Sequence, residues 1–466
     1  METVIGLEIH VQLATRTKLF CGCRADYFAA APNTLTCPVC LGMPGALPVP
    51  NRLAVEYALR VASALGSEVQ PRSHFDRKNY FYPDLPKGYQ ITQRAVPLAV
   101  GGELTYSLEG EKRRVRIREL HIEEDAGKLI HTPQGSLVDM NRCGVPLVEI
   151  VTEPDLRSPK EAREFLRALR TLLRHLGVSN ADMEKGELRC DANLSLSRDG
   201  ELGTKVEIKN LNSFRGVERA LQRAAQRQAE LLSQGGQVIQ ATYGWDEARG
   251  ELVLQREKEE AHDYRYFPEP DLVPLELSSE LLAEVRAGMP ELPWIRRERL
   301  IREYGINPRD AETLLSEPAL ADYFEEVAGE VGDGRAAASW VLSEVLRFWR
   351  EEGPPVPASE LSELIRRVQA GKVSRTNAKE LLEEAVESGS SLLELLESRD
   401  LAQVADEGEL RRLAQEAIAA HPQAVADFRA GKAQALGFLV GQVMRATRGR
   451  ADAKKLSRIL KELLAE

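Results

Sequence analysis

Residues 2–13, ETVIGLEIHVQL, decide the fold, because large apolar side chains recur at every second position from Ile5 to Leu13. The positions between them carry Gly6, Glu8, His10 and Gln12. Successive side chains of a β-strand point to opposite faces of its sheet. The stretch therefore predicts a strand with one face in a core and a polar face that presents Glu8 and His10.

Similar patterns predict further strands around this one. They lie at 145–152, 188–197 and 205–211, with short strands near 96–100, 104–108 and 115–121. A helix at 158–177 begins with SPKE, in which Ser caps the helix, Pro opens it and Glu completes a capping box. A second helix is predicted at 216–235. Strands of this kind interrupted by two helices indicate an α+β fold with a mostly antiparallel sheet.

The second half of the chain is predicted to be all-helical. The run GMPELP at 288–293 marks the boundary. We predict three domains, at 1–292, 293–400 and 401–466. The predicted helices lie near 296–304, 308–316, 318–330, 335–352, 359–371, 375–388, 408–420, 422–430 and 452–465.

Composition sets the broad class. The 466 residues include 62 basic and 72 acidic side chains, a net charge of −10, with 43% hydrophobic residues. That balance argues against a uniformly basic nucleic-acid coat and leaves room for a local basic patch. No apolar run approaches the ~18–20 residues that span a bilayer. The chain has only six cysteines. We expect it to carry no secretory leader and to be a cytoplasmic protein without a membrane partner.

Four of the six cysteines fall within 20 positions, as Cys21-x-Cys23 and Cys37-x-x-Cys40. Two close pairs of thiolates suit one tetrahedral Zn²⁺, and four protein ligands leave no open position for a substrate. The alternative is a cluster of small buried cysteines. The spacing favours a structural zinc knuckle at 21–40.

Acidic side chains gather on the predicted strands. Glu8 and His10 share a face, HIEEDAGK at 121–128 ends a strand in three acids, and Glu149 and Asp191 sit within strands. Carboxylates with one imidazole suit Mg²⁺ or Mn²⁺. The alternative is a solvated sheet face. That alternative fits Glu149 poorly, because its neighbours are apolar and a buried carboxylate needs a partner or a metal.

Two aromatic and basic segments, 75–84 and 263–270, are predicted loops that suit base stacking with a cation on phosphate. Packing of the same aromatic side chains on the core remains an equal alternative. The sequence has no P-loop, no Rossmann glycine pattern and no G-x-S-x-G elbow. Cys143 and Cys190 read as small packed side chains, so no side-chain nucleophile stands out.

The last 35 residues, 432–466, hold eight Lys/Arg against three Asp/Glu, a net charge of +5. This pattern predicts either a helical tail that contacts an RNA backbone or a solvated helix face. Beyond Lys432 and Arg445, the basic side chains of the stretch are Arg448, Arg450, Lys454, Lys455, Arg458 and Lys461.

Together these motifs resemble, from end to end, the B subunits of glutamyl/aspartyl-tRNA amidotransferases. The resemblance rests on long, specific strings. They are ETVIGLEIHV (2–11), FDRKNYFYP (75–83), HIEEDAGK (121–128), GELRCDAN (186–193), KNLNSF (209–214), DYRYFPEPD (263–271) and GFLVGQVM (437–444).

The resemblance implies a cradle-shaped catalytic domain, distantly similar to glutamine synthetase, followed by helical and tail domains that bind tRNA. Such a subunit uses ATP and Mg²⁺ to phosphorylate the side-chain carboxyl of Glu-tRNA(Gln) or Asp-tRNA(Asn). Ammonia from a partner amidase subunit then displaces the phosphate. A small linker subunit completes a heterotrimer, and the cognate non-discriminating aminoacyl-tRNA synthetase is a further candidate partner.

The resemblance also assigns residues. The Mg²⁺ ligands, which are also the catalytic residues, fall on His10, Glu124 and Glu149, with Glu8 and Asp191 around a second cation. Lys78 and Arg189 are interpreted as clamps for phosphate or carboxylate. The four cysteines match the zinc knuckle that some members of the family carry.

Two other functions fit parts of the sequence. One is a non-catalytic tRNA-binding adaptor whose acidic face is structural. The other is a standalone relative of glutamine synthetase that acts without tRNA.

Overall fold

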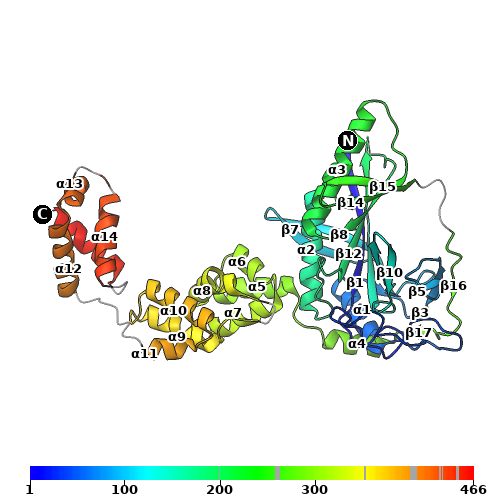
Figure 1. Ribbon diagram of the computed structural model, residues 1–466, viewed down its shortest axis with the longest axis horizontal. Coiled ribbons are helices and arrows are strands. Elements are labelled where there is room, and N and C mark those ends of the chain that lie inside the picture. Colours follow the sequence, from blue (N-terminus) through cyan, green and yellow to red (C-terminus); the bar gives the residue numbers. More distant parts are fainter. Residues whose placement is uncertain are drawn as a thin grey trace. The chain divides into compact units, whose positions relative to one another are not determined.

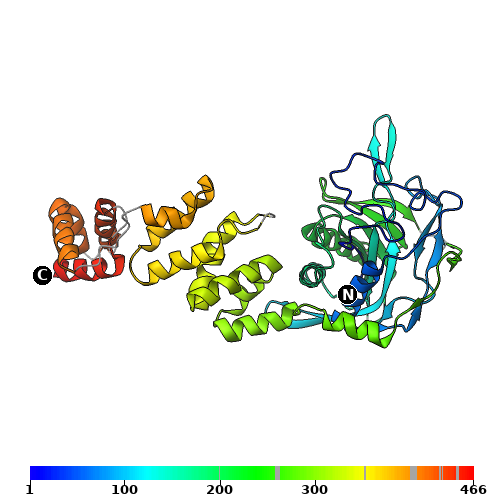
Figure 2. The same cartoon turned by 90° about the horizontal axis from the view of Figure 1, so that it is seen from below.

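The computed structural model describes residues 1–198, 200–257, 263–350, 353–398, 407–429, 432, 434–447 and 451–465. These residues form two compact units, Met1–Pro293 and Trp294–Glu466 (Figures 1 and 2). The domain boundary predicted at 400/401 lies outside the described residues, as do Arg448 and Arg450. In the part of the chain that is described, no helix has the length and apolar character needed to cross a bilayer.

The first unit is built on a ten-stranded sheet, ordered β15-β14-β13-β12-β1-β11-β8-β6-β2, with β7 paired to β8. All of its pairs are antiparallel except β13 with β14. The α+β class is therefore confirmed. The strands are β1 Glu2–Gln12, β2 Glu68–Val69, β6 Ala99–Val100, β7 Glu103–Leu108, β8 Glu111–Glu124, β11 Pro146–Thr152, β12 Leu188–Ser197, β13 Val206–Leu211, β14 Ala241–Asp246 and β15 Glu251–Glu257.

The core of this unit lies where β1 and β12 meet two helices, α2 (Pro159–His175) and α3 (Phe214–Ser233). The helices pack side by side along the sheet (Figure 1). Ser158 accepts the backbone N–H of Glu161 at 3.1 Å and Pro159 opens the helix, so the predicted Ser cap is confirmed. The Glu161 carboxylate accepts the backbone N–H of Arg157, one residue before the one that a capping box uses. In β1 the odd-numbered side chains enter this core, and the even-numbered ones stay on the other face.

Several elements were missed by the sequence patterns. The predicted loop 75–84 contains strand β4 (Asp76–Asn79), which pairs with β5 (Tyr89–Thr92) and with β16 (Phe267–Pro268) of the other predicted loop. These strands are too short for a periodic pattern to reveal them. Also missed were β14 and β15, helices α1 (Arg52–Ala64) and α4 (Ser279–Ala287), and the pairs β3 (Arg72–Ser73) with β17 (Leu275–Glu276) and β9 (Lys128–Thr132) with β10 (Gly135–Asp139).

The second unit is helical and has two apolar clusters, one before and one after residue 400. The helix predicted at 335–352 is interrupted, since α8 passes into a π-helical turn at Val341–Val345 and a 3₁₀ turn at Leu346–Phe348. The helices are α5 Pro293–Tyr304, α6 Pro308–Leu314, α7 Pro318–Val331, α8 Gly334–Trp340, α9 Ala358–Gln369, α10 Arg375–Ser388, α11 Leu392–Ser398, α12 Glu407–Ala420, α13 Pro422–Arg429, α14 Gln434–Ala446 and α15 Ala453–Ala465.

Packing of α2 in the core should contribute to the stability of the first unit. Leu169 of α2 is fully buried, so Leu169→Ala should lower the free energy of unfolding by about 3 kcal/mol. Leu231 of α3 is 38% exposed, and Leu231→Ala should change it by less than about 0.5 kcal/mol. Urea unfolding followed by circular dichroism measures both. Equal effects would contradict this assignment of the core.

Candidate functional site

The site lies on the face of the sheet opposite the residues that β1 buries. On one side of β1, His10 lies opposite Glu149 of β11, and on the other side it lies opposite Arg189 of β12. Glu8, two positions along, lies opposite Asp191. Pairing of β1 with two strands distant in sequence thus gathers the polar residues that the sequence singled out.

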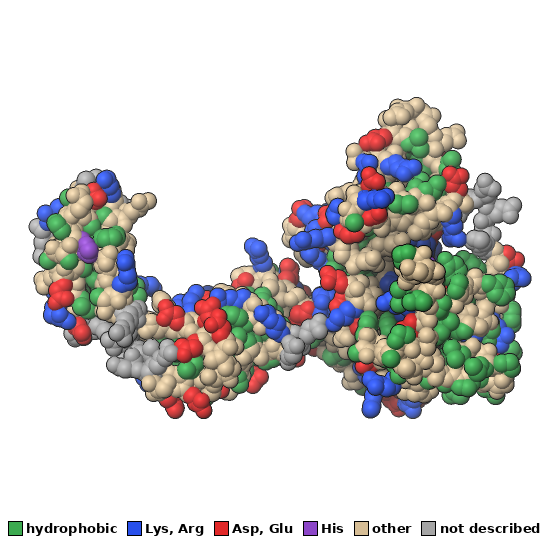
Figure 3. Space-filling model, in the orientation of Figure 1, with side chains coloured by type: hydrophobic (Ala, Val, Ile, Leu, Met, Phe, Trp, Pro, Cys, Tyr) green, Lys and Arg blue, Asp and Glu red, His purple; other side chains and the backbone are tan. Residues whose placement is uncertain are grey.

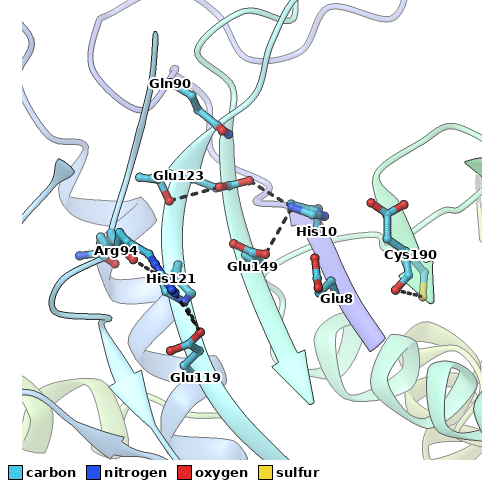
Figure 4. A network of polar contacts seen from close by, with 12 residues as sticks. Glu8, His10, Gln90, Arg94, Glu119, His121, Glu123, Glu149 and Cys190 are labelled. Carbon is cyan, nitrogen blue, oxygen red and sulfur yellow. Dashed lines mark hydrogen bonds and ion pairs between the residues drawn. The ribbon is translucent and has the colours of Figure 1, made fainter. Parts of the chain in front are cut away.

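His10 forms the centre of a candidate metal site with Glu123 and Glu149 (Figure 4). Its Nε2 lies 3.3 Å from Glu123 Oε1 and 3.7 Å from Glu149 Oε1. One ligand atom from each residue falls within 4.8 Å of the other two. Two carboxylates and an imidazole suit Mg²⁺ or Mn²⁺ by donor chemistry.

Glu124, the residue expected in this set, lies elsewhere. It pairs with the buried Lys87 and accepts the backbone N–H of Ile91 at 2.9 Å. The reason is a bulge in β8. Val151 lies opposite Glu119 but Thr152 lies opposite Ile117, which leaves Arg118 as an extra residue.

A bulge of this kind reverses, in the residues that follow it, which of two neighbouring side chains faces the core. Before the bulge Val115 and Ile117 are buried, and after it Leu120 and Ile122 are buried. The reversal places Glu123, not Glu124, beside Glu149. The apolar pair Leu120 and Ile122 was the sequence signal that could have identified Glu123.

The electrostatics of the cluster favour a bound cation. Burial and the neighbouring Glu123 raise the pKa of the Glu149 carboxyl above its usual range. Lys78 lies near both acids. Burial opposes its charge, but Glu123, Tyr266 and Glu149 raise the pKa of its ammonium group. A second positive charge would relieve the repulsion between the two carboxylates.

The two residues expected around a second cation are opposite each other but already have partners. Glu8 accepts a hydrogen bond from Asn193 Nδ2 at 3.2 Å. Asp191 accepts one from Lys209 Nζ at 2.5 Å, and the acids Asp191 and Glu207 raise the pKa of that lysine against the opposing effect of burial. A cation at this position would have to compete with Lys209.

The two predicted clamps differ in their surroundings. The Lys78 ammonium lies 5.1 Å from the ring centre of Tyr264, beside the metal cluster. Arg189 donates to Asp125 at 2.6 Å, and its buried Nε has no hydrogen-bond partner among the described residues. Arg189 and Arg142 lower the pKa of Asp125 despite its burial. Asp125 was not singled out from the sequence, and its role here is to anchor Arg189.

The cysteine cluster is a second candidate metal site. The four sulfur atoms of this cluster all lie within 4.8 Å of one another, and they belong to Cys21, Cys23, Cys37 and Cys40. The backbone N–H of Cys37 donates to Cys40 Sγ at 3.2 Å, and Lys18 Nζ lies 3.7 Å from that sulfur. The hydrogen bond from Cys21, with that from the Cys37 backbone and the charge of Lys18, lowers the pKa of Cys40 to about 5. Four sulfur donors so placed fit a tetrahedral zinc ion.

Two models of known protein families match the chain and define the class of protein. Residues 3–283 match the family model described as the GatB/GatE catalytic domain, and residues 322–464 match the one described as the GatB domain. The first match contains both candidate metal sites. The second falls within the helical unit.

Full-length relatives define the family. A protein of Thermomicrobium roseum is 54% identical over 100% of this chain and 99% of its own length, and one of Thermus thermophilus is 52% identical over 99% of each. Both are named as the B subunit of an aspartyl/glutamyl-tRNA(Asn/Gln) amidotransferase. The chain belongs to this family of amidotransferase B subunits.

Replacement of one glutamate at a time should show which of Glu123 and Glu124 binds the metal ion. We expect Glu123→Gln to weaken Mn²⁺ binding by at least about tenfold, because it removes one charged ligand. Glu124→Gln should leave Mn²⁺ affinity within about twofold, because its carboxylate faces Lys87. Calorimetric titration with Mn²⁺ measures both variants. A larger loss of Mn²⁺ affinity for Glu124→Gln than for Glu123→Gln would contradict the conclusion that Glu123 is the one that faces His10.

The cysteine cluster should bind zinc in the purified protein. Cys40→Ser is expected to remove the zinc and to lower the melting temperature, because the site closes the loop between residues 21 and 40. Cys190→Ala is the control, since Cys190 is buried outside the cluster. Elemental analysis gives the zinc content. Equal zinc in wild type and Cys40→Ser would refute the site.

Proposed function

We propose that the chain is the ATP-dependent subunit of a tRNA amidotransferase. It activates the side-chain carboxyl of Glu on tRNA(Gln), of Asp on tRNA(Asn), or of both. The observation that carries the proposal is the cluster of His10, Glu123 and Glu149 on the face of the sheet opposite the side chains that β1 buries. The names of the relatives supply the substrate class, and the cluster supplies a place for the phosphate chemistry.

His10, Glu123 and Glu149 would hold Mg²⁺, which when bound neutralises phosphate charge. Lys78 beside the two acids orients the anionic groups of the substrates. Arg189, which is fixed by Asp125 and has a side chain that is 35% exposed, presents a guanidinium group to anionic groups of the substrates. In the proposed reaction a carboxylate oxygen of the aminoacyl group attacks the γ-phosphorus and ADP leaves.

Ammonia then attacks the acyl carbon, and phosphate leaves to give the amide. The chain therefore needs no nucleophile of its own, in keeping with the buried thiols of Cys143 and Cys190, whose pKa values burial raises. A phosphate or carboxylate group of the substrates needs a cation in order to bind beside Glu123 and Glu149, because the two carboxylates carry negative charge themselves.

The remaining assignments follow the family. Residues 1–292 form the catalytic domain, distantly similar to glutamine synthetase and held at one end by a structural zinc ion. Residues 293–400 and 401–466 form helical and tail domains that bind tRNA. The exposed ammonium groups of Lys454 and Lys461 in α15 support a contact with a phosphate backbone.

A partner amidase subunit would supply ammonia, and a small linker subunit would complete the heterotrimer. Figure 3 shows apolar side chains gathered over one region of the first unit. Large apolar side chains exposed in this unit include Phe28, Met43, Leu47, Val49 and Phe81. Exposed apolar area of this kind is typical of surfaces that bind another protein.

Transamidation by the reconstituted complex tests the proposal. With mischarged tRNA, ATP, Mg²⁺ and free ammonium, Glu123→Gln should lower kcat by at least about 100-fold, because it disrupts the cation site. Glu230→Gln, on the exposed surface of α3, is the control and should keep full activity. Undiminished activity of Glu123→Gln would favour the non-catalytic adaptor instead. Full activity on free glutamate without tRNA would favour the standalone synthetase.

A further inference from the structure

The loop at residues 21–40, which carries the cysteine cluster, reaches the polar face of the sheet through the side chain of Tyr27. Tyr27 Oη accepts a hydrogen bond from Gln12 Nε2 at 3.0 Å and lies 3.3 Å from Gln12 Oε1. Gln12 follows His10 at the next position of β1 whose side chain points to this face. The contact therefore joins the loop to the strand that provides the histidine of the metal cluster.

The amide group of Gln12 also contacts a buried carboxylate. Gln12 Nε2 donates to Asp125 Oδ2 at 3.0 Å, and Arg189 Nη2 donates to the same oxygen at 2.6 Å. Only 7% of Gln12 and 3% of Asp125 is exposed, so little water competes for these hydrogen bonds. Hydrogen bonds in such surroundings are stronger than in water. Tyr27, Gln12, Asp125 and Arg189 thus form a continuous chain of polar contacts.

The chain of contacts ends on a cation that faces the metal cluster. Arg189 lies opposite His10 in the β1–β12 pair. Burial opposes the charge of Arg189, but Asp125 and Glu123 raise the pKa of its guanidinium group. The side chain is 35% exposed, which leaves it accessible to a substrate. The hydrogen bond from Arg189 to Asp125 therefore sets the direction of a group that lies within reach of the substrates.

A second cation competes for the same carboxylate. Arg142 Nε lies 3.6 Å from Asp125 Oδ2, and the Arg142 guanidinium group also donates to two backbone carbonyl oxygens. The Gln12 amide is a neutral donor, so it holds Oδ2 in place without adding another charge. If this donor were lost, rotation of the carboxylate toward Arg142 would weaken its hydrogen bond with Arg189.

The loop is itself fixed at several points. The cysteine cluster brings its two ends together. The backbone N–H of Asn33 donates to Asp139 Oδ1 at 3.0 Å, and the Asn141 side chain donates to the carbonyl oxygen of Ala31 at 2.7 Å. These contacts lie on either side of the β9–β10 hairpin and the loop, and they hold the Tyr27 hydroxyl where Gln12 can reach it.

We propose that Tyr27 is a positioning residue for Arg189 and that it acts through Gln12 and Asp125. The loop at 21–40 thereby contributes to the reaction as well as to the stability of the protein. The inference rests on the proposed function, because it takes Arg189 to bind anionic groups of the substrates. It adds Tyr27 and Gln12, which act by fixing the direction of the guanidinium group.

Steady-state transamidation by the reconstituted complex tests the proposal. Arg189→Lys should raise the KM of ATP or of the aminoacyl-tRNA at least about tenfold, because an ammonium group does not reproduce the planar guanidinium group. Tyr27→Phe removes only a hydroxyl group. It should raise the same KM about fivefold, the effect of one hydrogen bond, and leave kcat within about twofold. Gln12→Met, which removes both hydrogen bonds, should raise this KM at least as much.

A double-mutant cycle separates positioning of Arg189 from a general effect on the structure. The KM of Tyr27→Phe/Arg189→Lys should equal that of Arg189→Lys within about twofold, because Tyr27 acts through the group that is lost. Tyr57→Phe is the matched control, since Tyr57 is also half-buried but lies in α1. This variant should have the kcat and the KM values of wild type.

The proposal and the function on which it rests fail in different ways. Unchanged KM values in Tyr27→Phe and Gln12→Met, beside a raised KM in Arg189→Lys, would overturn the inference and leave the proposed function standing. Effects that multiply in the double variant would also refute it, because Tyr27 would then act independently of Arg189. Wild-type kinetics in Arg189→Lys would remove the anion-binding role of Arg189 together with this inference, whereas Glu123→Gln tests the metal cluster separately.

Discussion

The rest of the structure depends on the pairing of β1 with β11 on one side and β12 on the other. This double pairing buries Ile5, Leu7 and Ile9 in the core with the helical layer, and the burial of their apolar surface stabilises the sheet. Because the side chains of a strand alternate, the same constraint fixes Glu8 and His10 on the opposite face. Stability and chemistry are therefore set by one register: a slip of one residue would expose the core and bury the site.

The site brings two carboxylates together, those of Glu123 and Glu149, among apolar side chains that cannot neutralise their charge. Burial of Glu149 beside Glu123 disfavours two ionised carboxylates, and Lys78 offsets this only in part. A protein can retain such an arrangement where a ligand completes it. Glu123 and Glu149 suit a metal ion, and the nearby cationic side chains suit a phosphate group, so the site as a whole suits a metal ion bound to a phosphate. Activation of a carboxyl group by ATP requires such a pair.

The overall charge of −10 is an average over parts with different tasks. Acidic side chains surround a candidate cation site in the first unit, whereas the last 35 residues carry a net +5. In the described part of the tail some of this basic charge is internally paired, as between Arg458 and Glu407. The net charge of a chain thus says little about its partners, because binding depends on where the charges lie.

The sequence by itself determined the central strand, the α+β class, the capped helix α2, the cysteine cluster and four members of the polar face, Glu8, His10, Glu149 and Asp191, because each follows from local periodicity or spacing. Leu120 and Ile122 mark in the sequence the face on which Glu123 lies, but only tertiary structure decided that this face meets Glu149 and His10, since the bulge at Arg118 arises where β8 pairs with β11. It likewise turned two apparent loops into the paired strands β4 and β16, which lie far apart in the sequence. Such pairing depends on long-range contacts that no local pattern encodes.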